Sequence, residues 1–165
     1  MELELILGPN GSGKSLFAES EAVRSGGSLV YLATMIPQTP DNFARIEKHR
    51  RQRADKGFRT VECGWEIDQI AASSADAVLL EDASNLLANG IFAHGASGDE
   101  ALRQILALAD RTRKLIVVSI EGLLEAGYNA ETAAYIRALN ALNAALAQRA
   151  CAVYRMEQGV PRRLS

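Results

Sequence analysis

The chain has 165 residues, which is enough to bury one hydrophobic core but short for two ordinary domains, so we expect one domain over 1–165. Its formal net charge of -2 argues against a general attraction to nucleic acid, and no apolar run approaches the roughly 20 residues that cross a bilayer. No basic leader precedes the first apolar segment. Cys63 and Cys151 lack metal-ligand spacing, so we expect two small buried hydrophobes in a reduced, cytoplasmic protein without a membrane span.

The amino-terminal segment combines a strand pattern, a glycine-rich loop and a helix pattern. Residues 3–7 form a short apolar run, and a helical pattern begins at Leu16 and should end near Gly26. The loop between them fits G-x-x-x-x-G-K-[S/T] and comprises Gly8, Pro9, Asn10, Gly11, Ser12, Gly13, Lys14 and Ser15. In such a loop the backbone N–H groups bind phosphate, the lysine reaches the β- and γ-phosphates, and the serine hydroxyl ligates Mg²⁺. This pattern therefore predicts a nucleoside triphosphate site.

A second nucleotide-binding motif, which contains an acidic residue, is expected farther along the chain. Residues 28–34 and 58–62 are typical of strands, and a helix is predicted over 65–72. Residues 75–82 form an apolar strand pattern that ends in Glu81 and Asp82. A carboxylate at the carboxyl end of a strand meets Mg²⁺ or its water shell in phosphate-loop proteins. Glu81 is therefore predicted to complete the magnesium site with Ser15.

The most unusual segment is the basic stretch 41–55. If it is helical, Arg45, His49 and Arg53 lie four residues apart and share one face. Cationic neighbours disfavour the imidazolium and lower the pKa of His49, so the ring keeps a free lone pair near pH 7, as a nucleophile requires. The same arginines could bind the phosphates of the molecule that the histidine attacks. A solvated basic helix face with an incidental histidine is the alternative that this pattern leaves open.

The remaining chain alternates helix and strand patterns. Helices are predicted over 84–92, 99–113 and 130–150, and strands over 114–119, 153–156 and around Val160, with His94 in a surface loop. We expect Ile136, Leu139, Leu142 and Leu146 to face the core. This alternation predicts an α/β fold, a P-loop NTPase (RecA-like) three-layer sandwich whose mainly parallel central sheet is covered on both faces.

Several of these stretches together resemble one enzyme family. They are the phosphate loop, 31–35, the Arg-Ile-x-x-His-Arg sequence at 45–50 with its continuation to Arg53, 58–62, 79–81 with 84–89, and the tail 135–161. Over nearly its whole length the chain resembles the bifunctional adenosylcobinamide kinase/adenosylcobinamide-phosphate guanylyltransferases of cobalamin biosynthesis. The chain departs from the usual pattern at 119–121, where Ser-Ile-Glu stands in place of Thr-Asn-Glu.

The resemblance implies two reactions and a set of site residues. A nucleoside triphosphate, ATP or GTP, phosphorylates adenosylcobinamide; a histidine then takes GMP from GTP and passes it to adenosylcobinamide phosphate, giving adenosylcobinamide-GDP. By position, the guanylylated residue is His49. The nucleotide-contacting positions that the resemblance adds to the phosphate loop are Ala33, Thr34, Met35, Arg50, Arg51, Gln52, Arg53, Glu62 and Glu81. It also implies a homo-oligomer.

Two other functions fit the phosphate loop alone. A simple small-molecule kinase would bind ATP or GTP and form no covalent nucleotide adduct. A P-loop ATPase switch module is favoured locally by Gly-Pro-Asn-Gly-Ser-Gly-Lys-Ser, but the chain lacks the Leu-Ser-Gly-Gly-Gln signature and the length for a helical subdomain. Labelling of the protein from GTP distinguishes these alternatives.

Overall fold

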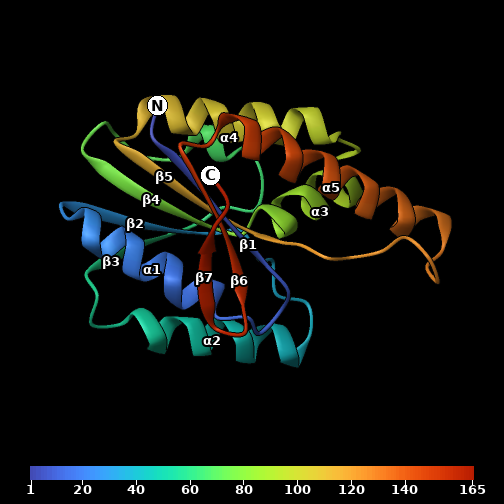
Figure 1. Cartoon of the computed structure of the whole chain (residues 1–165), viewed down its shortest axis with the longest axis horizontal. Helices are drawn as coiled ribbons and strands as arrows, with labels where there is room; N and C mark the ends of the chain where they lie inside the picture. Colours follow the sequence, from blue (N-terminus) through green and yellow to red (C-terminus); the bar gives the residue numbers. More distant parts are fainter.

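The fold is built on one seven-stranded sheet (Figure 1). The computed structural model describes residues 1–165, and the strand order is β3-β2-β4-β5-β1-β6-β7. All neighbouring strands are parallel except β6 and β7, which are antiparallel. The strands are β1 (Leu3–Gly8), β2 (Ser28–Ala33), β3 (Phe58–Glu62), β4 (Asp76–Glu81), β5 (Lys114–Ile120), β6 (Ala152–Glu157) and β7 (Val160–Arg163).

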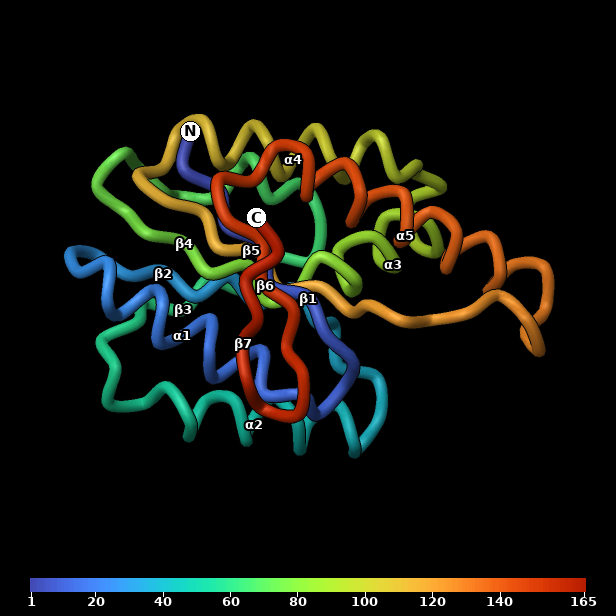
Figure 2. The backbone as a smooth tube through the Cα atoms, viewed as in Figure 1, coloured from blue at the N-terminus to red at the C-terminus, as the bar shows by residue number.

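Helices cover both faces of the sheet. They are α1 (Lys14–Ser25), α2 (Pro40–Arg53), α3 (Ala83–His94), α4 (Gly98–Arg111) and α5 (Ala130–Arg149), with a short 3₁₀ helix η1 (Ile67–Gln69). Figure 1 shows α3, α4 and α5 on one side and α1 on the other, with α2 beyond α1. Figure 2 shows the connection 121–129 and the start of α5 projecting away from the sheet.

Two hydrophobic cores explain why the strand patterns are nearly continuous. Leu3, Leu5 and Leu7 point into the core formed with α3, α4 and α5, whereas Ile6 points into the smaller core formed with α1. Because successive strand residues point to opposite faces, a strand buried on both faces needs an apolar residue at almost every position. The core-facing residues predicted on α5, Ile136, Leu139, Leu142 and Leu146, are buried.

The strand order places the two nucleotide motifs on one edge. β5 lies between β1 and β4, so the loop after β1 and the acid at the end of β4 meet at the carboxyl ends of parallel strands. An inserted strand between these two motifs is the arrangement of RecA-like proteins, and ligands of open α/β sheets bind at this edge. The predicted P-loop NTPase fold is therefore confirmed.

The predicted helix over 65–72 is wrong. Only the three residues of η1 are helical there, and tertiary hydrogen bonds take up the backbone groups that a helix would have paired. The Arg111 guanidinium donates to the carbonyl oxygens of Asp68, Ile70 and Ala72, and the Ile67 N–H donates to the Gln104 side chain. Side chains of α4 therefore supply hydrogen bonds to the backbone of this segment, which can then remain in an irregular conformation.

Three smaller expectations are also corrected. Cys151 is exposed and Cys63 is only partly buried, so neither cysteine is a buried core residue. His94 is exposed as predicted, but it is the last residue of α3 and its ring stacks on Trp65, with the centroids 5.7 Å apart. Trp65 also packs so closely on Gly90 that a Cβ there would lie 2.4 Å from the indole ring.

A buried ion pair lies at the edge of the sheet opposite the phosphate loop. Lys114 Nζ is 2.7 Å from Glu4 Oε1, and both side chains are 9% exposed. We expect Lys114→Ala to lower the free energy of unfolding by about 3–5 kcal/mol, because it leaves the Glu4 carboxylate buried without a counter-charge. Denaturant unfolding measures this loss. The double variant Glu4→Leu/Lys114→Met should recover most of it, and a loss below about 1 kcal/mol for Lys114→Ala would contradict the prediction.

Candidate active site

The phosphate loop has the backbone conformation that its glycines permit. Gly11 and Gly13 have φ values of 73° and 88°, in the left-handed region that side chains disfavour. Gly8 allows the loop to fold back closely, since a Cβ there would lie 2.6 Å from Ser12 Oγ. Lys14 is the first residue of α1, and its Nζ donates to the Pro9 carbonyl at 3.2 Å. The lysine ammonium therefore lies within the turn, at the amino terminus of a helix, where phosphates bind.

Ser15 and Glu81, the two residues expected to ligate a magnesium ion, are in contact. Ser15 Oγ donates to Glu81 Oε1 at 2.5 Å, and Glu81 Oε2 is buried without a hydrogen-bond partner. Burial, followed by the charge of Asp82, raises the pKa of Glu81 to about 8, whereas the Ser15 hydrogen bond opposes the shift. A hydroxyl and an unsatisfied carboxylate oxygen are ligands that Mg²⁺ prefers, so these residues fit the ion.

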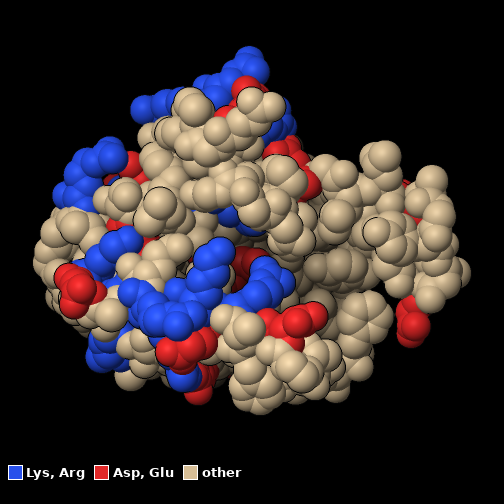
Figure 3. Space-filling view, turned by 90° about the horizontal axis from the view of Figure 1, so that it is seen from below, with Lys and Arg blue, Asp and Glu red and all other residues tan.

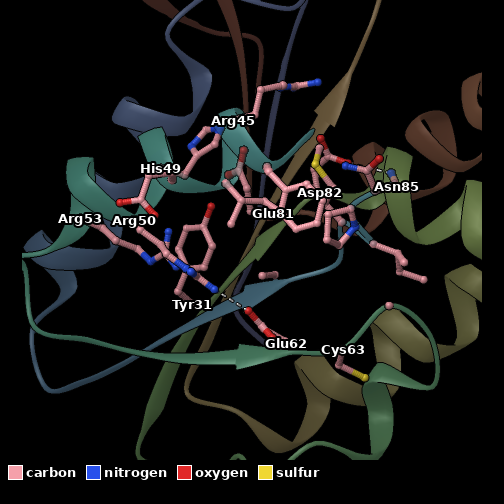
Figure 4. Close-up of a pocket in the computed structure, with 18 residues that line it drawn as sticks. Tyr31, Arg45, His49, Arg50, Arg53, Glu62, Cys63, Glu81, Asp82 and Asn85 are labelled. Carbon is pink, nitrogen blue, oxygen red and sulfur yellow. Dashed lines mark hydrogen bonds and ion pairs between the residues drawn. The ribbon is translucent and has the colours of Figure 1, made fainter. Parts of the chain in front are cut away.

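A pocket of about 690 Å³ opens between α2 and the ends of β2, β3 and β4 (Figure 4). Its apolar lining residues include Met35, Ile36, Pro37 and Phe43. Its polar lining residues include Arg45, His49, Arg50, Arg53, Glu62, Glu81, Asp82 and Asn85. A pocket lined by both apolar and charged side chains fits a molecule that carries both a ring system and phosphates.

His49 projects from α2 into this pocket, and its pKa is shifted in the predicted direction. Its Nδ1 is buried and has no hydrogen-bond partner. Burial lowers the pKa of His49 most, and the charges of Arg45, Arg53, Lys48 and Lys14 lower it further. The predicted direction is therefore supported, although the sequence argument missed the larger cause. Because the charge of Lys14 contributes to this shift, the His49 ring lies within electrostatic range of the phosphate loop.

The pKa of His49 can be measured directly. We expect its ring signals in NMR to titrate below the ordinary value of about 6.5, because the neutral form is favoured in the folded protein. The protein has two histidines, so the spectrum of His49→Ala assigns the signal. Unfolding the protein in denaturant should return the titration to the ordinary range. A midpoint at or above that range in the folded protein would contradict the burial of this ring.

Two arginines of α2 that line the pocket, Arg50 and Arg53, contact different residues of the sheet. Arg50 Nη2 lies 2.9 Å from Glu62 Oε1. The Arg53 guanidinium lies 3.8 Å from the centroid of the Tyr31 ring and donates to Thr60 Oγ1 at 3.2 Å. Figure 4 shows these side chains on the same side of the pocket as His49. The Arg53 guanidinium is therefore close enough to lower the pKa of His49, whereas that of Arg50 is directed to Glu62.

Three predicted nucleotide-contacting residues point elsewhere. The Thr34 hydroxyl is buried and accepts from the Asp82 N–H at 2.8 Å, so it joins the ends of β2 and β4. The Gln52 amide donates to Glu19 on α1, and Arg51 is exposed outside the pocket. Ala33 and Met35, in contrast, line the pocket as the resemblance implied.

Tyr31, Arg45 and Asp82 are among the pocket residues that were not predicted as nucleotide contacts. Tyr31 was expected only as a residue of a buried strand, yet its ring forms part of the pocket. Arg45 was expected to share a face with His49 but was not included among the nucleotide contacts. Asp82 caps α3, its carboxylate accepting from the Asn85 N–H at 2.8 Å. The pair of acids after β4 was the signal that could have indicated Asp82.

Basic groups also gather around the mouth of the pocket. Figure 3 views the molecule from below Figure 1, the side where α2 lies, and shows Lys and Arg side chains clustered beside a hollow. The exposed cations of α2 are Arg45, Lys48, Arg50 and Arg51. This local positive surface, on a chain with a net charge of -2, attracts anions to the mouth of the pocket.

No helix is long and apolar enough to span a bilayer. A search of curated proteins found no match to the chain. The sequence model of one family, described as "Cobinamide kinase / cobinamide phosphate guanyltransferase", matches residues 4–164. The match covers the phosphate loop, the histidine helix and both carboxyl-terminal strands, and it confirms the resemblance stated from the sequence. The chain therefore belongs to the cobinamide kinase / cobinamide phosphate guanyltransferase family of transferases.

Proposed function

We propose that the protein phosphorylates adenosylcobinamide with ATP or GTP and then transfers GMP from GTP, through His49, to adenosylcobinamide phosphate. The observation that carries the proposal is a half-buried imidazole whose Nδ1 is buried without a hydrogen-bond partner, in a pocket that also contains Glu81 at the phosphate-loop edge. A kinase that used only the phosphate loop would not require a lowered histidine pKa beside it.

The guanylyl transfer proceeds in two displacements. In the first, a lone pair of the neutral His49 ring forms a bond to the α-phosphorus of GTP. The bond from that phosphorus to the bridging oxygen breaks, and its electron pair leaves with pyrophosphate. In the second, a phosphate oxygen of adenosylcobinamide phosphate attacks the same phosphorus, and the nitrogen–phosphorus bond breaks. The ring takes back the electron pair and, because its other nitrogen has kept its proton, returns to the neutral imidazole as adenosylcobinamide-GDP is released.

The charged groups of the pocket support both displacements. Lys14 and the loop N–H groups bind the phosphates. Arg50 and Arg53 offset the charge that develops on the phosphoryl oxygens. Mg²⁺, held by Ser15 and Glu81, would neutralise charge on the triphosphate when bound. Glu81 must be ionised to ligate the ion, and its raised pKa means that ion binding displaces a proton from this carboxyl.

Labelled GTP tests the proposal. The protein is incubated with Mg²⁺ and GTP labelled on the α-phosphate, denatured, and assayed for bound label that is lost in acid and kept in base. GTP labelled on the γ-phosphate is the control and should leave no bound label. A folded protein that binds GTP but keeps no α-label would reject the guanylyl-transfer proposal and favour the simple kinase.

A further inference from the structure

Helix α2, which carries His49, is not held by apolar packing. Its one buried residue is Arg53, whereas Phe43 is 60% exposed and Ile46 is only half-buried. Most helices of globular proteins are fixed by burying an apolar face. The position of α2, and therefore of His49, depends on its polar contacts.

Those polar contacts are concentrated at the carboxyl-terminal end of α2. On α2, only Arg50, Gln52 and Arg53 have side chains that hydrogen-bond to other elements. Lys56, just beyond the helix, makes one more such contact. Arg50 and Arg53 contact β2 and β3, which form the floor of the pocket. Gln52 and Lys56 instead reach a single residue of α1, Glu19.

Glu19 is a fully buried carboxylate that receives both contacts. One oxygen accepts from the Gln52 amide, and the other lies 3.3 Å from Lys56 Nζ. The residue has 0% relative exposure, and its charge contributes to the raised pKa of Glu81. A buried carboxylate is stable only when it is paired and hydrogen-bonded, so these contacts define a specific geometry.

Glu19 also shares a rigid element with the phosphate-binding groups. It follows Ser15 by four residues on α1, and Gln52 follows His49 by three residues on α2. The contact between Glu19 and Gln52 therefore sets the distance between two rigid helices, one carrying Lys14 and Ser15 and the other carrying His49. We propose that Glu19 is a positioning residue that fixes His49 against the phosphate loop for attack on the α-phosphorus.

This inference rests on the proposed function, and it predicts a selective defect. In Glu19→Gln, the rate of label transfer from GTP to the protein at saturating GTP should fall about 10- to 100-fold, since a misplacement near 1 Å costs on that order. GTP affinity and phosphorylation of adenosylcobinamide should change less than about threefold, because neither needs the imidazole. Lys56→Met should reduce labelling in the same direction, and the double variant should be no worse than Glu19→Gln alone.

Glu21→Gln is the matched control. Glu21 is a buried carboxylate on the same helix, but its ion pair is with Arg24 of α1 and not with a residue of α2. Hydrogen exchange supplies a readout besides activity: the amides of residues 41–53 should exchange faster in Glu19→Gln than in Glu21→Gln. Equal exchange in the two variants, or a labelling rate unchanged from the wild type, would overturn the positioning role. A wild-type protein that never acquires label would instead reject the guanylyl-transfer proposal, and exchange would still report whether Glu19 holds α2.

Discussion

Replacing His49 with asparagine is expected to abolish formation of the covalent GMP adduct. The change removes the nucleophile, and losses from removing a nucleophile reach about 10⁶-fold. Asparagine keeps a polar group of similar size in a half-buried position, so we expect the fold to remain intact. GTP binding should persist because the phosphate loop is unchanged, and so should phosphorylation of adenosylcobinamide. The measurement is single-turnover labelling with α-labelled GTP, together with a separate assay of the kinase step.

The other histidine provides the control. His94 is exposed at the end of α3, stacks on Trp65, and does not line the pocket. His94→Ala should therefore label at the wild-type rate. Retention of acid-labile label in His49→Asn, or its loss in His94→Ala, would show that His49 is not the acceptor.

Removing the lysine of the phosphate loop should affect both reactions. Lys14 is buried, and its ammonium is placed within the turn by the Pro9 carbonyl. In Lys14→Ala we expect kcat/KM to fall about 10²- to 10³-fold or more for the kinase and the guanylyl-transfer steps alike, as when one preorganised charge-stabilising donor is lost. Weakened GTP binding should account for part of the loss. Steady-state kinetics of each step, with GTP affinity measured separately, checks this expectation.

Arg24→Ala is the control for loss of a cation on α1. Arg24 is exposed, lies at the last turn of the same helix, and pairs only with Glu21. The Arg24→Ala variant should leave the rates of both reactions unchanged. A Lys14→Ala variant that loses one reaction and keeps the other would imply two nucleotide sites, in conflict with a shared phosphate loop.

The sequence was sufficient to predict the elements that carry the phosphates. Strands β1, β2, β4 and β5 are buried on both faces and are therefore recognisable as short apolar runs. The glycine loop and the acid at the end of β4 are recognisable because phosphate and magnesium binding require particular residue types at these positions. Their meeting at one edge follows from parallel strand direction alone.

Tertiary contacts explain what the sequence could not predict. The segment after β3 was predicted to be helical because nothing in it shows that Arg111 and Gln104, far along the chain, would bind its backbone. At the end of β5, Ser119 was read as a departure from the family pattern. Its hydroxyl donates to Asn143 Oδ1 at 2.6 Å, so an asparagine from α5 lies beside this strand end. Periodicity within one segment carries no information on such distant partners.

The lowered pKa of His49 illustrates the same limit. Helical spacing identified the neighbouring cations Arg45 and Arg53, but burial of the ring is the larger cause. Burial depends on where α2 lies against β2 and β3, and polar contacts such as that between Gln52 and Glu19 determine this position. Gln52, which the resemblance implied as a nucleotide contact, instead bonds to α1 in the structure.

Mapping the adduct tests the central claim most directly. The wild-type protein is reacted with Mg²⁺ and GTP, denatured in base, and cleaved after glutamate, which releases residues 48–62 with His49 as its one histidine. Mass spectrometry should find one GMP on this fragment, attached to the imidazole and removed by brief acid treatment. GMP on a different fragment, or an unmodified fragment from a protein that turns over GTP to adenosylcobinamide-GDP, would contradict transfer through His49.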